Sequence, residues 1–177
     1  MDNPIITSRD IYEDPRGSFE KLYDEKMQST LSLAEFTIRQ VNRSSNIAKG
    51  TVRGLHYQKG SESEAKIISV LRGSIRDYAV DLRVGNKTFG KVWEFDLSFG
   101  GRTTLYLPRG FAHGFQTLEN NTELLYLHSN HYRADYESGI NILDPALKIQ
   151  LPLAISNMSE RDQSFLSFNE EMKNEYT

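Results

Sequence analysis

The sequence predicts an all-β fold, either a sandwich or a barrel of short strands with a few short helices around it. Segments with alternating or continuous apolar patterns recur at roughly ten-residue spacing along the chain. Glycine and asparagine pairs stand between these segments, where tight turns need them. The length of 177 residues fits one domain, so we expect a single domain over residues 1–177.

The expected strands follow one another through most of the chain. Residues 74–83 show the two-residue period of a strand, and residues 65–73 form an apolar run that ends at a glycine turn. The segments expected as strands are residues 36–42, 52–58, 65–73, 74–83, 91–98, 102–108, 108–115 and 122–129.

Two stretches are expected to be short helices, residues 23–31 and residues 159–173. The second has a recognisable start. Ser159 is a suitable N-cap, and Asp162 follows it at the spacing of a capping box. Both helices would lie at the periphery of the β domain.

Composition excludes several classes of protein. Apolar residues make up 38% and charged residues 25%, which is typical of a globular chain. The net charge of −3 is too small to indicate a nucleic-acid or membrane partner, and the absence of cysteine excludes disulfides and thiolate chemistry. The N-terminus lacks a signal-peptide pattern, and no run of 18 apolar residues occurs. We therefore expect a cytoplasmic protein.

Polar side chains interrupt two of the apolar strands. The stretch VRGLHYQ (52–58) contains Arg53 and His56, and PRGFAHGF (108–115) contains His113 between apolar residues. Strict alternation places Arg53 and His56 on opposite faces, but Gly54 between them is typical of a bulge that would let them converge. The alternative is a surface arginine and a hydrogen-bonded core histidine.

Three further strands raise the same question. Gln40 and Asn42 share one face with apolar neighbours, either as site residues or on a solvated edge strand. Lys66 opens an apolar strand, either in a site or snorkelling from the strand end. Tyr126 lies among leucines, where a buried hydroxyl needs a partner.

A metal site is not indicated by the histidines. His128 and His131 have helical spacing in a region that reads as a strand end, and no HExxH motif occurs. The sequence also lacks a nucleophilic cysteine, a GxSxG elbow, a P-loop and a GxGxxG motif. The remaining histidine, tyrosine, lysine, arginine and carboxylates suit proton transfer and anion binding.

A series of motifs follows in one order along residues 14–162. They are DPRGSFEKLY, QVNRSSN, VRGLHYQ, AKIISVLRGSIRDYAVDLR, TFGKVWEFDLS, LPRGFAHGFQTL, ELLYLHSNHY, ILDPALKIQLP and SERD. Together they resemble the dTDP-4-dehydrorhamnose 3,5-epimerase family, the RmlC-like branch of the cupins. The resemblance implies a double-sheet jelly roll and a homodimer that exchanges N-terminal segments.

The resemblance also implies a reaction. The substrate is a nucleotide-linked 4-keto-6-deoxyhexose whose C3 or C5 proton is removed to form an enolate. His56 matches the general base and Asp162 the carboxylate that holds it. Tyr126 matches the acid on the opposite face, and Lys66 the cation beside the C4 oxyanion. No metal or redox cofactor is implied.

Substrate contacts carry over in the same way. Arg16 and Arg53 match positions near the diphosphate, where guanidinium groups suit phosphate oxygens. Phe19 and Tyr132 match an aromatic pair that sandwiches the nucleotide base, with Phe19 reaching in from the partner subunit. Asp77 is expected to orient His113. The other implied contacts are Gln40, Asn42, His113 and Glu137.

The sequence departs from the family pattern at a few positions. Lys21 stands where a glutamate is expected, Leu127 replaces a lysine after the tyrosine, and NILD and LP replace VWND and WP. The Lys21 change leaves the nucleoside diphosphate open. Alternatives to a 3,5-epimerase are a single-centre epimerase, a 3,4-ketoisomerase and a non-catalytic sugar-nucleotide-binding cupin. The intact set of implied catalytic residues favours an epimerase.

Overall fold

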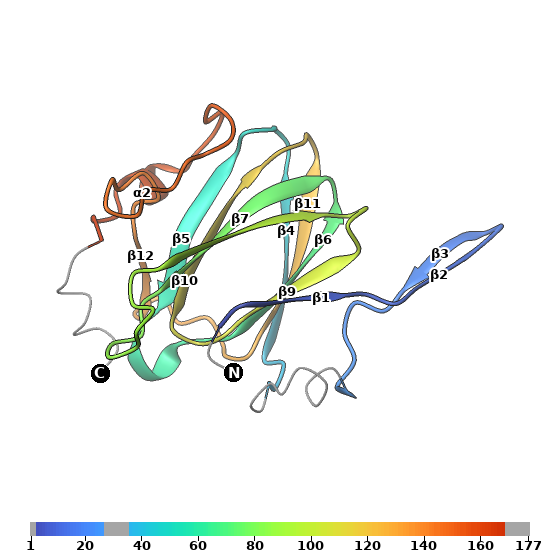
Figure 1. Ribbon diagram of the computed structural model, residues 1–177, viewed down its shortest axis with the longest axis horizontal. Coiled ribbons are helices and arrows are strands. Elements are labelled where there is room, and N and C mark those ends of the chain that lie inside the picture. The colour runs from blue at the N-terminus through green and yellow to red at the C-terminus, as the bar shows by residue number, and fades with distance from the viewer. Residues whose placement is uncertain (1–2, 27–35, 169–177) are drawn as a thin grey trace.

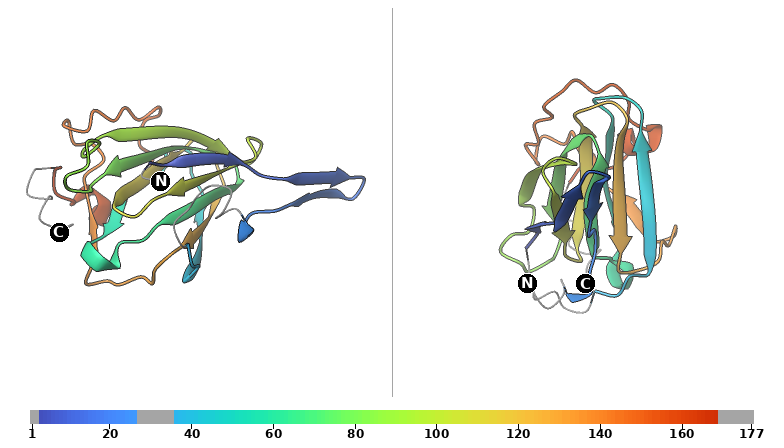
Figure 2. Two further views of the ribbon diagram at one scale, coloured as in Figure 1. Left: turned by 60° about the horizontal axis from the view of Figure 1, so that its bottom comes forward. Right: turned by 90° about the vertical axis from the view of Figure 1, so that its right-hand side faces the viewer.

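The computed structural model describes residues 3–26 and 36–168. Two five-stranded antiparallel sheets face one another in two layers, and a separate two-stranded hairpin extends from them (Figures 1 and 2). The all-β, double-sheet fold expected from the sequence is confirmed. No helix in the described ranges has the length and apolarity needed to cross a bilayer.

The first sheet has the strand order β1-β9-β6-β11-β4, and the second has the order β12-β5-β10-β7-β8. The strands of the first sheet are β1 (Ile5–Ser8), β9 (Thr103–Leu107), β6 (Lys66–Arg72), β11 (Thr122–His128) and β4 (Gln40–Asn46). Those of the second are β12 (Glu137–Gly139), β5 (Val52–Gln58), β10 (Phe111–Thr117), β7 (Ser74–Asp81) and β8 (Val92–Ser98). The hairpin consists of β2 (Ile11–Asp14) and β3 (Gly17–Glu20). The helices assigned within the described residues are η1 (Gly60–Glu62) and α2 (Glu160–Gln163).

The inner faces of the two sheets form a shared apolar core. Its members come from both layers: Ile68, Val70, Ile75, Ala79, Leu97, Leu105, Leu107, Phe111, Phe115 and Leu124. Alternate residues of a strand share a face, so the same strand faces continue from this core into polar residues. On β6 the row runs from Val70 and Ile68 to Lys66. The fold thus carries polar side chains inward at one end of the sandwich.

One predicted strand begins later than expected. The segment at residues 36–42 was predicted as a strand, but β4 starts at Gln40 and continues to Asn46. Phe36 is instead buried in a satellite cluster, with its ring 6.2 Å from that of Tyr106. Strand pairing decides the boundaries, because β11 provides partners from Gln40 as far as Asn46.

The second predicted helix is shorter than expected. Ser159 caps α2 as predicted, since its hydroxyl accepts a hydrogen bond from the Asp162 amide at 3.0 Å. The helix ends at Gln163, because the chain then turns so that the Phe165 ring packs on His56. Residues 169–173 and most of the predicted helix at 23–31 lie outside the described residues.

The β2–β3 hairpin projects away from the sandwich (Figure 1). Tyr12 and Phe19 are directly opposite each other on its two strands. Their exposed fractions are 65% and 73%, so both rings lie largely outside the packed interior of the described residues. The hairpin therefore presents an aromatic pair outward.

Candidate active site between the two sheets

A cavity of about 550 Å³ opens between the polar ends of the two sheets. One wall belongs to β4, β6 and β11, and the other to β5 and β10. The residues that line it include Asn42, Ser44, Glu64, Lys66, Tyr126 and His128 on the first side, and Arg53, His56, Gln58, His113, Phe115, Tyr132 and Glu137 around the second. It contains most of the residues that the sequence singled out.

Strand register places the polar residues of the first wall in rows. His128 on β11 is paired with Lys66 on β6 and with Gln40 on β4. One row further along, Tyr126 is paired with Asn42. Residues paired across antiparallel strands have neighbouring side chains. Lys66, His128, Asn42 and Tyr126 therefore face the cavity together, and Gln40 lies beside its lining.

In the second wall, Arg53 and His56 converge on the cavity. Both line the cavity, although they lie three residues apart on β5. The pairing of β5 with β10 shifts register at this point, and Gly54 has a φ of +105°. A Cβ at Gly54 would lie 2.6 Å from the Gly114 Cα, so only glycine permits this approach of the two strands. The predicted bulge is confirmed.

His56 and Asp162 form a hydrogen-bonded pair. The His56 Nε2 lies 2.8 Å from the Asp162 Oδ1, and the Gly54 amide donates to the Asp162 Oδ2 at 3.0 Å. Burial tends to raise the pKa of Asp162, but the hydrogen bonds from His56 and Gly54 outweigh it and the pKa lies below its ordinary value. The carboxylate therefore stays ionised and leaves Nδ1 as the ring nitrogen available to a substrate.

An aromatic ring covers the back of this pair. The Phe165 ring meets the His56 ring edge-on, with centroids 5.6 Å apart and planes at 81°. Space for the ring depends on Gly139, where a Cβ would lie 2.3 Å from the Phe165 Cε2. Phe165 was not singled out in the sequence, because a single aromatic residue after a short helix carries no distinguishing pattern.

His113 and Asp77 form a second pair, deeper in the second sheet. The His113 Nε2 lies 2.7 Å from the Asp77 Oδ2, and both residues are buried. Burial raises the pKa of Asp77 and lowers the pKa of His113, because a low-dielectric site disfavours the charged form of each. This hydrogen bond holds the His113 ring against Asp77.

Tyr126 lies between two of the histidines. Its ring is 6.2 Å from that of His113 in an edge-on arrangement and stacks on His128 at 6.0 Å. Burial raises the pKa of Tyr126 well above its ordinary value, and a hydrogen bond with Ser44 only partly offsets this. The phenol therefore remains protonated at neutral pH and is suited to donate a proton.

Lys66 has an ion-pair partner that sequence reasoning missed. The Lys66 Nζ lies 3.2 Å from the Glu64 Oε1, and both side chains are less than a tenth exposed. Burial alone would raise the pKa of Glu64, but Lys66, His128 and Gln58 together lower it to about 2. Glu64 lies two residues before Lys66, so the two side chains are expected on the same face of an extended chain. This spacing was the signal in the sequence that could have predicted the ion pair.

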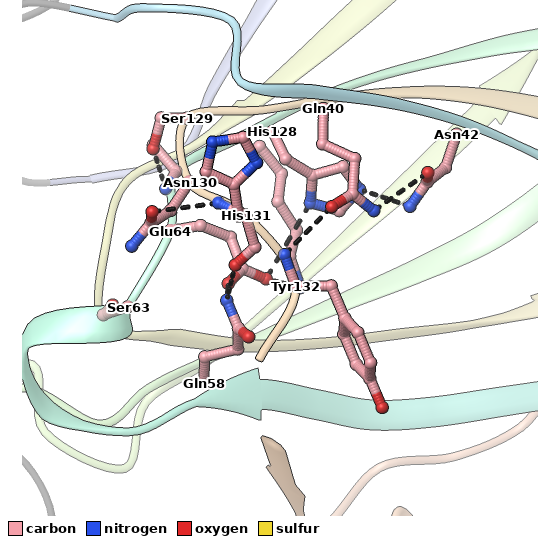
Figure 3. Close-up of polar contacts among 12 residues, drawn as sticks. Gln40, Asn42, Gln58, Ser63, Glu64, His128, Ser129, Asn130, His131 and Tyr132 are labelled. Atoms are coloured by element: carbon pink, nitrogen blue, oxygen red, sulfur yellow. Dashed lines mark hydrogen bonds and ion pairs between the residues drawn. The ribbon is translucent and has the colours of Figure 1, made fainter. Parts of the chain in front are cut away.

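Side-chain amides and a carboxylate hold together the part of the site around Tyr132. The Gln40 Nε2 donates to the Asn42 Oδ1 at 3.0 Å, and the Gln40 Oε1 accepts from the Tyr132 amide at 2.9 Å (Figure 3). The Tyr132 hydroxyl donates to the Glu137 Oε2 at 2.5 Å, and Arg161 pairs with the same oxygen at 2.8 Å. Gln40 thus supports the site from outside its lining.

Arg16 and Phe19 are not brought to the cavity of their own chain. Both lie on the projecting β2–β3 hairpin, and the Arg16 side chain is 90% exposed and pairs with Asp14. Lys21, just after the hairpin, pairs with Asp24 at 2.8 Å. In residues 3–26 and 36–168, no group of three or more histidine or acidic side chains is arranged to hold a metal ion.

Comparisons with known proteins agree with this geometry. A family model described as dTDP-4-dehydrorhamnose 3,5-epimerase matches residues 1–170. The dTDP-4-dehydrorhamnose 3,5-epimerase of Sinorhizobium fredii is 37% identical over 154 residues, covering 86% of this chain and 78% of that protein. The dTDP-4-dehydrorhamnose 3-epimerase of Streptomyces niveus is 36% identical over 154 residues, covering 86% and 73%.

A solved structure has the same fold throughout. It is the dTDP-6-deoxy-D-glucose-3,5-epimerase RmlC of Legionella pneumophila, in complex with dTDP-4-keto-L-rhamnose. Its TM-score is 0.89 at 34% sequence identity, and the match covers 96% of this chain and 91% of that one.

Proposed function

Because the chain belongs to the dTDP-4-dehydrorhamnose 3,5-epimerase family, we propose that its cavity inverts carbon centres of a nucleotide-linked 4-keto-6-deoxyhexose by proton transfer. The chain is thus an isomerase of the sugar-nucleotide epimerase type. One observation carries the residue assignments: His56 and Tyr126 project from opposite walls of the cavity. A sugar ring between them has a base on one face and an acid on the other.

His56 is the general base. Its Nδ1 takes a proton from the carbon next to the C4 carbonyl, and the electron pair moves to the carbonyl oxygen to give an enolate. Asp162 keeps the ring oriented through Nε2 and stabilises the imidazolium that forms. General-base catalysis of this kind contributes a factor of about 10²–10⁴ in rate.

Tyr126 is the acid. Its phenol gives a proton to the same carbon from the opposite face, and the configuration is inverted. The phenolate and the imidazolium then exchange protons with water, which restores both groups. The phenol of Tyr126 is protonated at neutral pH, since burial raises its pKa, and its proton is therefore available to the enolate carbon.

Lys66 faces the enolate oxygen. It is the buried ammonium at the floor of the cavity, in the row next to Tyr126. An oriented cation at a developing oxyanion lowers the barrier by about 3 kcal/mol or more in comparable sites. His113, fixed by Asp77, lines the same region and supports the position of the sugar.

The nucleoside diphosphate occupies the outer part of the cavity. Arg53 is oriented for phosphate binding, because its Nε donates to the Asn46 Oδ1 at 2.7 Å and its terminal nitrogens stay free of that bond. Asn42 and Gln40 supply amide contacts. Tyr132, held by Glu137, offers a ring for the base to stack on.

The active unit is a homodimer that exchanges its N-terminal hairpins. The support is the projecting β2–β3 ribbon, whose exposed Phe19 and Arg16 find no cavity in their own chain. In the partner's site Phe19 would close the other face of the base, and Arg16 would reach the diphosphate. Residues 1–177 act as one RmlC-like cupin domain, and the family model over residues 1–170 supports this. The cytoplasmic location expected from the sequence stays a prediction.

Both C3 and C5 are inverted in this proposal. The S. fredii and L. pneumophila proteins are named 3,5-epimerases, whereas the S. niveus protein is named a 3-epimerase. Proteins at similar identity therefore differ in the number of centres they invert, and a direct measurement on this chain decides it.

The test is proton NMR of the protein with dTDP-4-keto-6-deoxyglucose in D₂O. We expect deuterium at both C3 and C5, because each abstraction exchanges the proton with solvent. His56→Asn should lose this exchange, while the matched variant His131→Asn should keep it. Tyr126→Phe should retain exchange and lose inversion, since the acid alone is removed.

Each other outcome contradicts a specific part. Label at one carbon only would show a single-centre epimerase. Exchange by His56→Asn at the wild-type rate would show that another residue is the base. No exchange with the dTDP substrate or with its CDP, UDP and GDP analogues would contradict the epimerase function.

A further inference from the structure

We infer that Glu64 is a positioning residue for the reaction: it holds the Lys66 ammonium at the place where the enolate oxygen develops. The inference rests on the proposed function, because it assumes that Lys66 acts on that oxygen. Neither the motifs nor the resemblance assigned Glu64 a role.

The backbone places the two groups together. Lys66 is the first residue of β6 and Glu64 lies two positions earlier, so both side chains leave the chain on the cavity side. Ala65 between them is buried in the opposite direction, in a satellite core cluster with Ile67. The extended backbone at residues 64–66 therefore directs both side chains toward the cavity, whatever contacts they make there.

A lysine at this site needs such a partner. Its ammonium ends a flexible stem with many rotamers, and a buried ammonium without an anion tends to lose its proton. The Glu64 Oε1 lies 3.2 Å from the Nζ. This contact leaves donors of the ammonium for a substrate oxygen, since an ammonium has three.

Glu64 is itself held on two other sides. Gln58 donates to its Oε2, and His128, directly opposite Lys66 on β11, has its Nδ1 3.8 Å from the Oε1 (Figure 3). Gln58 also binds the loop after β11, by donating to the His131 carbonyl at 3.1 Å and by accepting from the Arg133 amide. The carboxylate is therefore a fixed point between two strands and a loop.

Two roles for Glu64 make opposite predictions. If it positions Lys66, its loss should lower kcat and leave KM unchanged or lower, because removal of an anion favours a negatively charged substrate. If it only anchors the loop that carries Tyr132, its loss should raise KM through weaker nucleotide binding. A displacement of about 1 Å at a reacting group costs up to about 100-fold in rate.

The test compares Glu64→Gln, Lys66→Met and the double variant. Glutamine has the same shape and still accepts a bond from Gln58, so the change is one of charge. Glu62→Gln is the matched control, since Glu62 lies two residues before Glu64 and its carboxylate contacts Asn130 rather than Lys66. Steady-state kcat and KM, and thermal unfolding, are measured for each protein.

We expect Glu64→Gln to lower kcat about 10- to 100-fold with KM within about twofold or lower. In the Lys66→Met background the same change should alter kcat less than about twofold, because the group it positions is gone. It should lower Tm in the wild-type background and raise Tm in the Lys66→Met background, where Glu64 is left buried without its cation. Glu62→Gln should match the wild type.

A raised KM with unchanged kcat in Glu64→Gln would overturn the inference, as would an equal loss of kcat with and without Lys66. The proposed function fails separately: in that case the wild type itself shows no epimerisation. A third outcome is an active wild type and a Lys66→Met variant that reacts at the same rate. This result would contradict the role of Lys66, and the inference about Glu64 with it. The proposed roles of His56 and Tyr126 would be unaffected.

Discussion

Two buried carboxylates at the site stay ionised for different reasons. Asp162 is held by hydrogen bonds from an imidazole and a backbone amide, whereas Glu64 faces an ammonium. The first arrangement fixes the orientation of a base, since the bond directs one ring nitrogen. The second arrangement fixes the position of the Lys66 ammonium, whose other N–H groups can still point toward another acceptor. In the proposed mechanism, a carboxylate therefore supports acid–base chemistry in one place and electrostatic stabilisation in the other.

Glu64 makes stability depend on pH in a defined range. Its pKa in the folded protein is about 2 against an ordinary value of 4.5, so the ionised form stabilises the fold fully above about pH 4.5. This contribution is lost as the pH falls toward 2. Between pH 6 and pH 3 the wild type should lose about 2 kcal/mol of unfolding free energy more than Glu64→Gln.

Denaturant unfolding of the two proteins at both pH values measures this difference. The comparison cancels the other acidic groups, Asp162 included, because both proteins keep them. Parallel loss of stability in the wild type and in Glu64→Gln would contradict the low pKa of Glu64.

At the scale of residues, periodicity could indicate unusual positions but not their partners. Arg53, His56 and Lys66 were noticeable because they interrupt apolar strands. The link from His56 to Asp162 spans 106 positions, and only the resemblance to a family pointed to it. Glu64 escaped both routes, because an acidic residue before a strand usually faces solvent, and its burial depends on strands β11 and β5 that the local sequence does not contain.

At the scale of elements, the segment around α2 connects three parts of the site. Asp162 on the helix holds His56, Arg161 beside it pairs with Glu137, and Phe165 after it covers the His56 ring. β12 meets this segment closely, since Gly139 leaves just enough room for the Phe165 ring. A disturbance at this contact should therefore reach the base.

Gly139→Ala tests that connection. Its Cβ would lie 2.3 Å from the Phe165 ring, so the ring must move away from His56. We expect a loss of about 1–3 kcal/mol in stability from overpacking. We also expect kcat to fall about tenfold through displacement of the base.

Gly100→Ala is the matched control, because a Cβ at Gly100 meets nothing within 4 Å. Thermal unfolding and the deuterium-exchange rate are the measurements. If the two alanine variants behaved alike, the Phe165 contact would have no bearing on His56.

Longer strands were predicted well and short ones were not. Strands β6, β7, β8, β10 and β11 are long enough for the alternation of apolar and polar residues to be recognised in the sequence. Strands β1, β2, β3 and β12 have three or four residues each, too few to display a period, and pairing with a neighbour creates them. The start of β4 was misplaced for the same reason, since its partner β11 sets it.

At the scale of the whole molecule, the sandwich separates the proposed base from the proposed acid. His56 belongs to one sheet and Tyr126 to the other, and both line the cavity between the sheets. The apolar core at the other end of the same strands keeps the spacing of the sheets. The fold class was predictable from the alternation of apolar and polar residues and from the turn residues. Which side chains face one another across the cavity depends on strand register in both sheets, and the local sequence does not contain it.

The proposed exchange of hairpins predicts complementation between two impaired variants. His56→Asn lacks the base, and Phe19→Ala lacks the aromatic ring on its hairpin. In a mixed dimer one site combines an intact His56 with an intact hairpin from the other chain. Refolding the two variants together at equal amounts should restore about a quarter of the sites, because half of random dimers are mixed.

Activity of the co-refolded mixture, compared with that of the two proteins refolded separately, measures the effect. A second mixture, with Tyr12→Ala in place of Phe19→Ala, compares the two aromatic residues of the hairpin, because Tyr12 lies directly opposite Phe19. A mixture no more active than the sum of its parts would contradict the exchange of hairpins.

None of the proposed catalytic residues lies on the projecting ribbon of residues 11–20. In the proposed dimer this ribbon supplies part of the nucleotide contact, and the cavity supplies the rest. A substitution on the ribbon or at its foot, where Lys21 lies, should therefore change nucleotide affinity and leave the proposed proton-transfer residues in place. Recognition and chemistry are in this sense partly separable in the proposed dimer.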